Sequence, residues 1–232
     1  MTVVMGGITK SYVQISADRR RSTFNGEDFS ESIEEWANKI IQLSDHIVLT
    51  ALGDVDATDK GKEGLMQALK RNPNQSVKEL IKDAESIFRE ALMERKKEYA
   101  DKLHNNKSII DRIFFKKKPL EDIQVNAAYL IGGFDLNKKE TFLYLFGNDD
   151  NYKAMELEAA NFLALGECMT EIAGRLEGRL NPSTNLTKCK RVFETEIKFA
   201  ASQKESVNTN IYHCTITKNG ITFSENPPKP KK

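Results

Sequence analysis

Cysteine and long apolar runs are scarce in this chain, and each scarcity excludes a class of protein. Three cysteines, Cys168, Cys189 and Cys214, occur among 232 residues, and no two of them form a CxxC pair. An odd number of cysteines without that spacing favours neither a disulfide framework nor a zinc site. We therefore expect a reducing, cytoplasmic setting, with no metal and no other cofactor. No segment approaches the roughly 20 apolar residues that span a bilayer, and no export signal is recognisable, so we expect no membrane contact.

An excess of charge of one sign is also lacking. The 35 Lys and Arg residues are balanced by 34 Asp and Glu residues, which leaves a formal net charge of +1. The two signs are interleaved along the chain, which argues against nucleic acid as a partner. With 39% hydrophobic residues the chain can bury a large core, and we expect a single domain over residues 1–225. Residues 226–232, rich in proline and lysine, are expected to form a disordered tail.

Alternating apolar residues predict strands at the start of the chain. The segment from Val3 to Asp18 is expected to form two strands, and Ser22–Ser32 a polar loop. A short strand is expected near Lys39–Leu43, followed by a strand at His46–Leu52 that Gly53 and Asp54 end. Further strands are predicted at 125–134, 141–146, 210–217 and 221–223, and the segment 155–165 fits a strand or a helix equally well.

Apolar residues at spacings of three and four predict the helices. The first is expected over about Ala57–Leu69, and the second begins at Ser76, where Glu79 has the capping-box spacing, and fades near Leu103. An exposed connection with a lysine run follows over residues 105–121. Two more helices are expected, at 170–180 and from a cap at Ser183 or Thr184 onward.

This order of elements predicts an α+β fold. Strand pairs joined by short turns are expected to be mostly antiparallel, and helices inserted in pairs must cover the sheet faces. The economical arrangement is a four-layer αββα sandwich of two sheets between two helical layers.

The second residue of the chain suggests a chemistry. Methionine is normally trimmed before a residue as small as threonine, so we expect a mature protein that begins at Thr2. A terminal threonine carries a hydroxyl and a free amine that titrates near pH 8, and this amine can serve as the base that activates the hydroxyl. No histidine is required, and we interpret His46, His104 and His213 as structural or surface residues.

Such a nucleophile needs a buried cation to keep its amine neutral, and the cation needs a carboxylate. Lys39 and Asp18 are the candidates, because each lies at the end of a predicted strand.

Several motifs resemble the catalytic proteasome subunits and the bacterial HslV-type peptidases, a family of N-terminal-nucleophile (Ntn) hydrolases. Asp18 follows Thr2 by sixteen residues and Gly53 follows Lys39 by fourteen, which are the family's intervals. Only the loop before Lys39 is longer than usual. Two further stretches, Tyr129–Asp135 and Leu163–Gly166, resemble the family's central hairpin and its Ala-Ile-Gly-Ser turn.

The resemblance implies a role for each matching residue. Thr2 would be the nucleophile and its amine the base, while Lys39 lowers the pKa of the pair and Asp18 orients Lys39. The N–H group of Gly53 would contribute to an oxyanion hole. Supporting or substrate-binding roles would fall to Arg20, Ala51 and Asp59, with Asp59 favouring a basic side chain before the cut bond.

Two departures from the family pattern bear on activity. Where the family has a serine after the glycine of its turn, this chain has Glu167, whose carboxylate could hold the Thr2 amine protonated or act as a base. The family's Asp-x-x-Ser-Gly pattern is missing, and only Ser202, Glu205 and Ser206 occupy that region.

Three functions stay open at this point. The first is a threonine peptidase that cuts peptides or unfolded proteins, in a homo-oligomeric ring and with a possible ATP-dependent unfoldase as partner. The second is a related amidohydrolase or transpeptidase that acts outside a ring. The third is a non-catalytic structural or interaction subunit, which Glu167 and the missing pattern favour.

Overall fold

The computed structural model describes residues 2–24, 31–105 and 119–226. Their contacts divide the chain into two compact units. The first unit contains the chain up to Leu52, Tyr129–Leu145 and the chain from Met155, and the second contains Gly53–Ala128 and Phe146–Ala154. The expectation of a single domain over residues 1–225 stays a prediction.

The first sheet has five strands in the order β10-β1-β2-β11-β12, and every neighbouring pair is antiparallel. The opening strand pair predicted from alternation is confirmed, with Val4 opposite Ala17. The strands are β1 (Val3–Ile8), β2 (Val13–Asp18), β10 (Phe162–Gly166), β11 (Ile211–Thr217) and β12 (Gly220–Asn226).

The second sheet also has five strands, in the order β5-β6-β7-β8-β9. β5 pairs antiparallel with β6, and β8 with β9. The strands are β5 (Ile40–Ser44), β6 (Ile47–Gly53), β7 (Ala127–Asp135), β8 (Glu140–Phe146) and β9 (Met155–Glu156).

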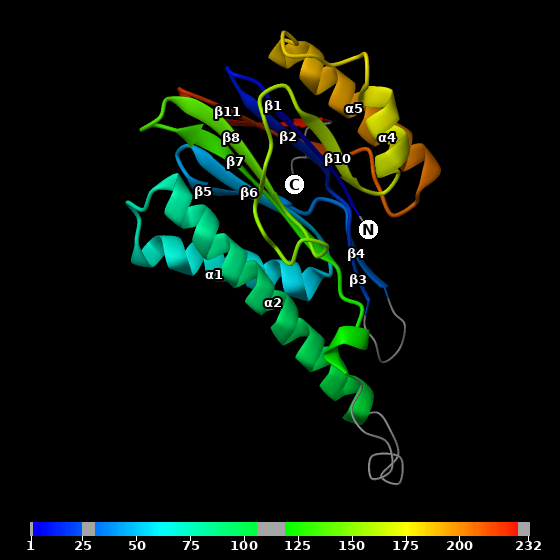
Figure 1. The fold of residues 1–232 in the computed structure, drawn as a ribbon. Coiled ribbons are helices and arrows are strands. Elements are labelled where there is room, and N and C mark those ends of the chain that lie inside the picture. The colour runs from blue at the N-terminus through cyan, green and yellow to red at the C-terminus, as the bar shows by residue number, and fades with distance from the viewer. Residues whose placement is uncertain (1, 25–30, 106–118, 227–232) are drawn as a thin grey trace, which may run out of the picture. The chain divides into compact units, whose positions relative to one another are not determined.

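The first unit is built in three layers (Figure 1). Successive side chains of a strand point to opposite faces, so both faces of β1 enter a core. Val4 and Ile8 pack in a cluster with Val48 and Leu130 of the second sheet. Val3 and Met5 pack on the other face, against the helices α4 (Met169–Leu176) and α5 (Leu186–Gln203). The first sheet therefore lies between the second sheet and a helical layer.

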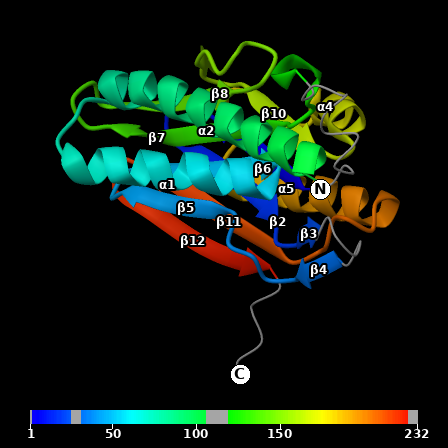
Figure 2. The same ribbon diagram turned by 90° about the horizontal axis from the view of Figure 1, so that it is seen from below.

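The second unit is built around the helices α1 (Val55–Arg71) and α2 (Val77–Asn105), which run side by side (Figure 2). Asp54 caps α1 by accepting a hydrogen bond from Ala57 N–H at 2.9 Å. The predicted capping box of α2 is confirmed, since Ser76 N–H donates to Glu79 at 2.8 Å and Glu79 N–H to Ser76 Oγ at 3.3 Å. A short 3₁₀ helix, η1 (Leu120–Asp122), contacts α2.

Three expectations from the sequence need correction. The two ends of the segment predicted as a polar loop, Ser22–Ser32, belong to the antiparallel strands β3 (Arg21–Phe24) and β4 (Glu31–Glu34). Helix α4 ends at Leu176 rather than near residue 180. Segment 155–165, for which strand and helix were both open, contains β9 and most of β10. The cap of α5 is Asn185, one residue beyond the predicted ones, because its side chain accepts from Lys188 N–H at 2.9 Å.

The fold described is thus mixed α+β with antiparallel pairing. Most of the expected lysine-rich connection, at 106–118, and nearly all of the expected tail, at 227–232, lie outside the described residues. Within the part of the chain that the structure covers, no helix is both long and apolar enough to cross a membrane.

Candidate functional site

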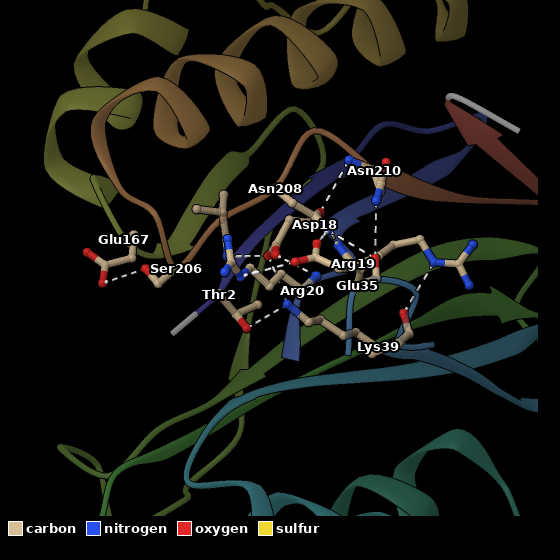
Figure 3. Close-up of polar contacts among 12 residues, drawn as sticks. Thr2, Asp18, Arg19, Arg20, Glu35, Lys39, Glu167, Ser206, Asn208 and Asn210 are labelled. Atoms are coloured by element: carbon tan, nitrogen blue, oxygen red, sulfur yellow. Dashed lines mark hydrogen bonds and ion pairs between the residues drawn. The ribbon is translucent and has the colours of Figure 1, made fainter. Parts of the chain in front are cut away.

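The ammonium group of Lys39 joins Thr2 to Asp18 (Figure 3). Lys39 Nζ donates to Thr2 Oγ1 at 2.7 Å and to Asp18 Oδ1 at 2.9 Å. The lysine side chain is 8% exposed and the aspartate is fully buried. The structure therefore brings together Thr2, Lys39 and Asp18, the nucleophile, cation and carboxylate expected from the sequence.

Strand geometry explains why these groups meet. Asp18 is the last residue of β2, and Thr2 immediately precedes β1, so the antiparallel pairing of β1 with β2 brings them to the same end of the first sheet. Lys39 immediately precedes β5 of the second sheet. Its long side chain therefore reaches from one sheet to the other.

Backbone groups complete the surroundings of Asp18. Val3 N–H donates to its Oδ1 at 2.9 Å and Arg20 N–H to its Oδ2 at 3.0 Å. Burial raises the pKa of the Asp18 carboxyl, while Lys39 and these two N–H groups act to lower it. The charge of the carboxylate therefore depends on its partners, above all on Lys39.

A close backbone approach fixes the other side of Thr2. Glu167 N–H donates to the Thr2 carbonyl at 3.1 Å. Gly166 has φ +92°, and a Cβ at that position would lie 1.8 Å from the Thr2 carbonyl oxygen. Only glycine fits this turn without displacing Thr2.

Glu167 itself is half-buried beside the site (Figure 3). Ser206 Oγ donates to its carboxylate at a long 3.5 Å. Of the three residues in the region of the missing family pattern, Ser206 makes this contact, Glu205 offers its carbonyl to Arg20, and Ser202 donates to Phe199 O within α5.

The supporting residue Arg20 contacts the site through its backbone. Its guanidinium instead donates to Glu205 O at 2.6 Å and pairs with Glu35 at 3.6 Å. Asn208 Nδ2 also binds the Glu35 carboxylate, at 2.7 Å. Arg20 thus links β2 to the segments around Glu35 and Glu205.

The remaining predicted residues are Ala51, Gly53 and Asp59. Ala51 is buried on β6 of the first unit. Gly53 and Asp59 belong to the second unit, where Gly53 has φ +114° and Asp59 pairs with Lys62 at 3.4 Å. The substrate-binding and oxyanion roles of these three residues stay predictions.

Sequence reasoning missed the side chains that hold the segment before Lys39. Arg19 and Asn208 both contact residues 35–37, and Asn210 Nδ2 donates to Glu35 O at 3.2 Å. No spacing signal marks them, because their partners are backbone carbonyls brought close by the tertiary fold.

A second constellation involves His213. Its Nδ1 lies 2.7 Å from Ser16 Oγ, and its Nε2 lies 3.2 Å from a Glu194 carboxylate oxygen. Gln14 Nε2 donates to the same serine at 3.0 Å. Burial lowers the pKa of His213 to about 4, so its imidazole is neutral at pH 7.

No model of a known family matches the sequence, and no curated protein matches it. Among residues 2–24, 31–105 and 119–226, no group of three His, Cys, Asp or Glu residues is placed to hold a metal ion.

Proposed function

We propose that this protein is a threonine-type N-terminal-nucleophile hydrolase of the four-layer αββα class, which cleaves peptide bonds through an acyl-enzyme on Thr2. The observation that carries the proposal is the position of Lys39 Nζ, at 2.7 Å from Thr2 Oγ1 and 2.9 Å from Asp18 Oδ1. A buried lysine that shares its protons between a carboxylate and a hydroxyl is suited to activate that hydroxyl.

The proposed reaction begins once the chain before Thr2 has been removed. The free α-amine accepts the hydroxyl proton while Oγ1 attacks the carbonyl carbon of the substrate. The Lys39 ammonium stabilises the negative charge that develops on Oγ1 as it loses its proton. The protonated amine then gives its proton to the leaving nitrogen as the peptide bond breaks. Water, activated by the same amine, hydrolyses the resulting ester and regenerates Thr2.

The charge of Lys39 supports this use of the amine. A nearby cation disfavours a second positive charge, so Lys39 is expected to lower the pKa of the Thr2 amine and keep it neutral near pH 7. Asp18 holds Lys39 in place and compensates its charge. The resemblance adds Gly53 as an oxyanion donor, a role that rests on the resemblance alone.

Mass spectrometry of the purified protein tests the proposal. We expect a mature chain that begins at Thr2, and a covalent adduct on Thr2 after treatment with a peptide epoxyketone or vinyl sulfone. Thr2→Ala is the matched control and should form no adduct. A mature protein that retains residues before Thr2 and forms no adduct would refute the proposed enzymatic activity.

A non-catalytic module is the second candidate, because Glu167 occupies the position where the family has a serine and its N–H binds the Thr2 carbonyl. A retained Met1 in the mature protein would favour it. If an adduct forms, product analysis with added amines separates a peptidase from a transpeptidase, and native mass measurement separates a ring from a monomer.

A further inference from the structure

Arg19 joins four segments of the first unit. Its side chain is 6% exposed, and its guanidinium forms an ion pair with Glu225 of β12. The same guanidinium lies 5.0 Å from the ring centre of Tyr212 on β11 and 5.4 Å from that of Trp36. A buried arginine with this many partners is held in one orientation.

The side chain and backbone of Arg19 together grip the segment before Lys39. Its Nη2 donates to Trp36 O at 2.9 Å and its Nε to Ala37 O at 3.3 Å. Its own carbonyl accepts from Ala37 N–H at 2.9 Å. Ala37 is therefore bound to Arg19 through both its N–H and its carbonyl.

The contacts of Arg19 with Ala37 are important because the segment before Lys39 has no regular secondary structure. Residues 37–39 lie between β4 and β5 in neither helix nor strand, so no ladder of backbone hydrogen bonds sets their position. Asn38 is exposed, whereas Ala37 and Lys39 are buried. Lys39 is only two residues beyond the carbonyl that Arg19 holds, so a shift of that carbonyl moves the base of the lysine side chain.

We propose that Arg19 is a positioning residue for Lys39, which sets the ammonium within reach of Thr2 and Asp18 by holding the backbone at Trp36 and Ala37. This inference rests on the proposed function where it concerns catalysis. The contacts of the Arg19 side chain are with Trp36, Ala37, Tyr212 and Glu225, and the first two lie on the segment that leads to Lys39.

Arg19→Met removes the ion pair and both carbonyl contacts while keeping much of the apolar stem. We expect Lys39 Nζ to move away from Asp18, which removes the cation that lowers the pKa of that carboxyl. The titration midpoint of Asp18, followed by NMR of the ¹³C-labelled carboxyl, should therefore rise. The rate of adduct formation on Thr2 should fall about tenfold, with inhibitor affinity changing less than the rate.

Arg175→Met is the control. Arg175 also has an ion pair, with Glu196, and a ring contact, with Phe199 at 4.3 Å, and it belongs to the same unit. The Arg175→Met substitution should leave the titration midpoint of Asp18 and the rate of adduct formation on Thr2 unchanged. Arg19→Lys keeps the charge but lacks the planar fork, and it should give a smaller rise in the midpoint and a smaller loss of rate.

The NMR readout separates this inference from the proposed function, because it needs no activity. An unchanged Asp18 midpoint in Arg19→Met, or an equal change in the control, would overturn the positioning role. If Arg19→Met does not fold, Arg19→Lys takes its place, and a wild-type midpoint in that variant would be equally decisive. If the wild-type protein forms no adduct while the titration midpoint of Asp18 rises in Arg19→Met, the proposed hydrolase activity is wrong and the positioning role of Arg19 stands.

Discussion

Two constellations in the first unit contain a hydroxyl, a basic nitrogen and a carboxylate. One is Thr2, Lys39 and Asp18, and the other is Ser16, His213 and Glu194. By composition alone the Ser16 constellation is closer to a catalytic triad, because serine, histidine and an acid in hydrogen-bonded order form the best-known arrangement.

Their surroundings separate them. Ser16 is fully buried within β2, and its hydroxyl accepts a hydrogen bond from Gln14. Glu194, which contacts His213, belongs to α5. Thr2 is half-buried and immediately precedes β1. The two constellations therefore differ less in their side chains than in access to the hydroxyl, because Thr2 is half-buried and Ser16 is fully buried.

The largest expected effect follows from removing each of the two hydroxyl groups by substitution with alanine. Thr2→Ala should lower the rate of peptide hydrolysis or adduct formation by about 10³-fold or more, since the nucleophile is lost. Ser16→Ala should leave that rate unchanged and lower the free energy of unfolding by about 1–2 kcal/mol, because a buried hydrogen bond is lost. The reverse pattern, in which adduct formation needs Ser16, would show that the proposal places the chemistry in the wrong constellation.

Removing the cation of the first constellation should be costly for stability. Lys39→Met leaves the fully buried Asp18 without its counter-charge, and we expect the free energy of unfolding to fall by about 3–5 kcal/mol. The double variant Lys39→Met/Asp18→Asn should recover part of this loss in urea denaturation while staying inactive. A double variant no more stable than the single one would show that the charge of Asp18 is not what destabilises it.

Two glycines test the close approach at Thr2. Gly166 and Gly178 both have positive φ, at +92° and +75°, but a Cβ at Gly178 meets nothing within 4 Å. Gly178→Ala should therefore cost only the conformational penalty, about 1–2 kcal/mol. Gly166→Ala must also displace the Thr2 carbonyl, and thermal denaturation should show a larger loss. It should slow adduct formation as well, whereas equal losses and equal rates in the two variants would contradict the geometry.

A pH dependence of stability is expected from His213. Its pKa is about 4 in the folded protein and 6.5 as the ordinary value, so the unfolded chain binds more protons between these pH values. Stability from this residue is therefore fully present above pH 6.5 and is lost as pH falls toward 4, by at most about 1.4 kcal/mol per pH unit. Urea denaturation at pH 7 and pH 5 should show this slope in the wild type.

His213→Gln provides the comparison for that slope. Glu194 and Lys190 of α5 face the imidazole and stay in place in the variant, so only the contribution of His213 is removed. The difference in stability between pH 7 and pH 5 should become smaller. An unchanged difference would mean that other groups carry the pH dependence.

Much of this architecture could be predicted because the signals are local. The alternation over Val13–Asp18 and the capping box of Ser76 and Glu79 depend on residues close in sequence, and both are found in the structure. The hairpin β3–β4 was missed because polar residues hide its pattern. The cap at Asn185 was misplaced by one residue because three neighbouring residues can all accept at a helix start.

The sequence was sufficient to predict most of the strands and helices, and to select Thr2, Asp18 and Lys39 as candidate site residues. The contacts of Arg19 and Asn208 with the segment before Lys39, and the burial of Ser16 and His213 in a sheet, became visible in the folded protein and could not be predicted from the sequence. The physical reason is that periodicity and capping act within a few residues of the chain. Burial and contacts with distant carbonyls exist only after the sheets have packed.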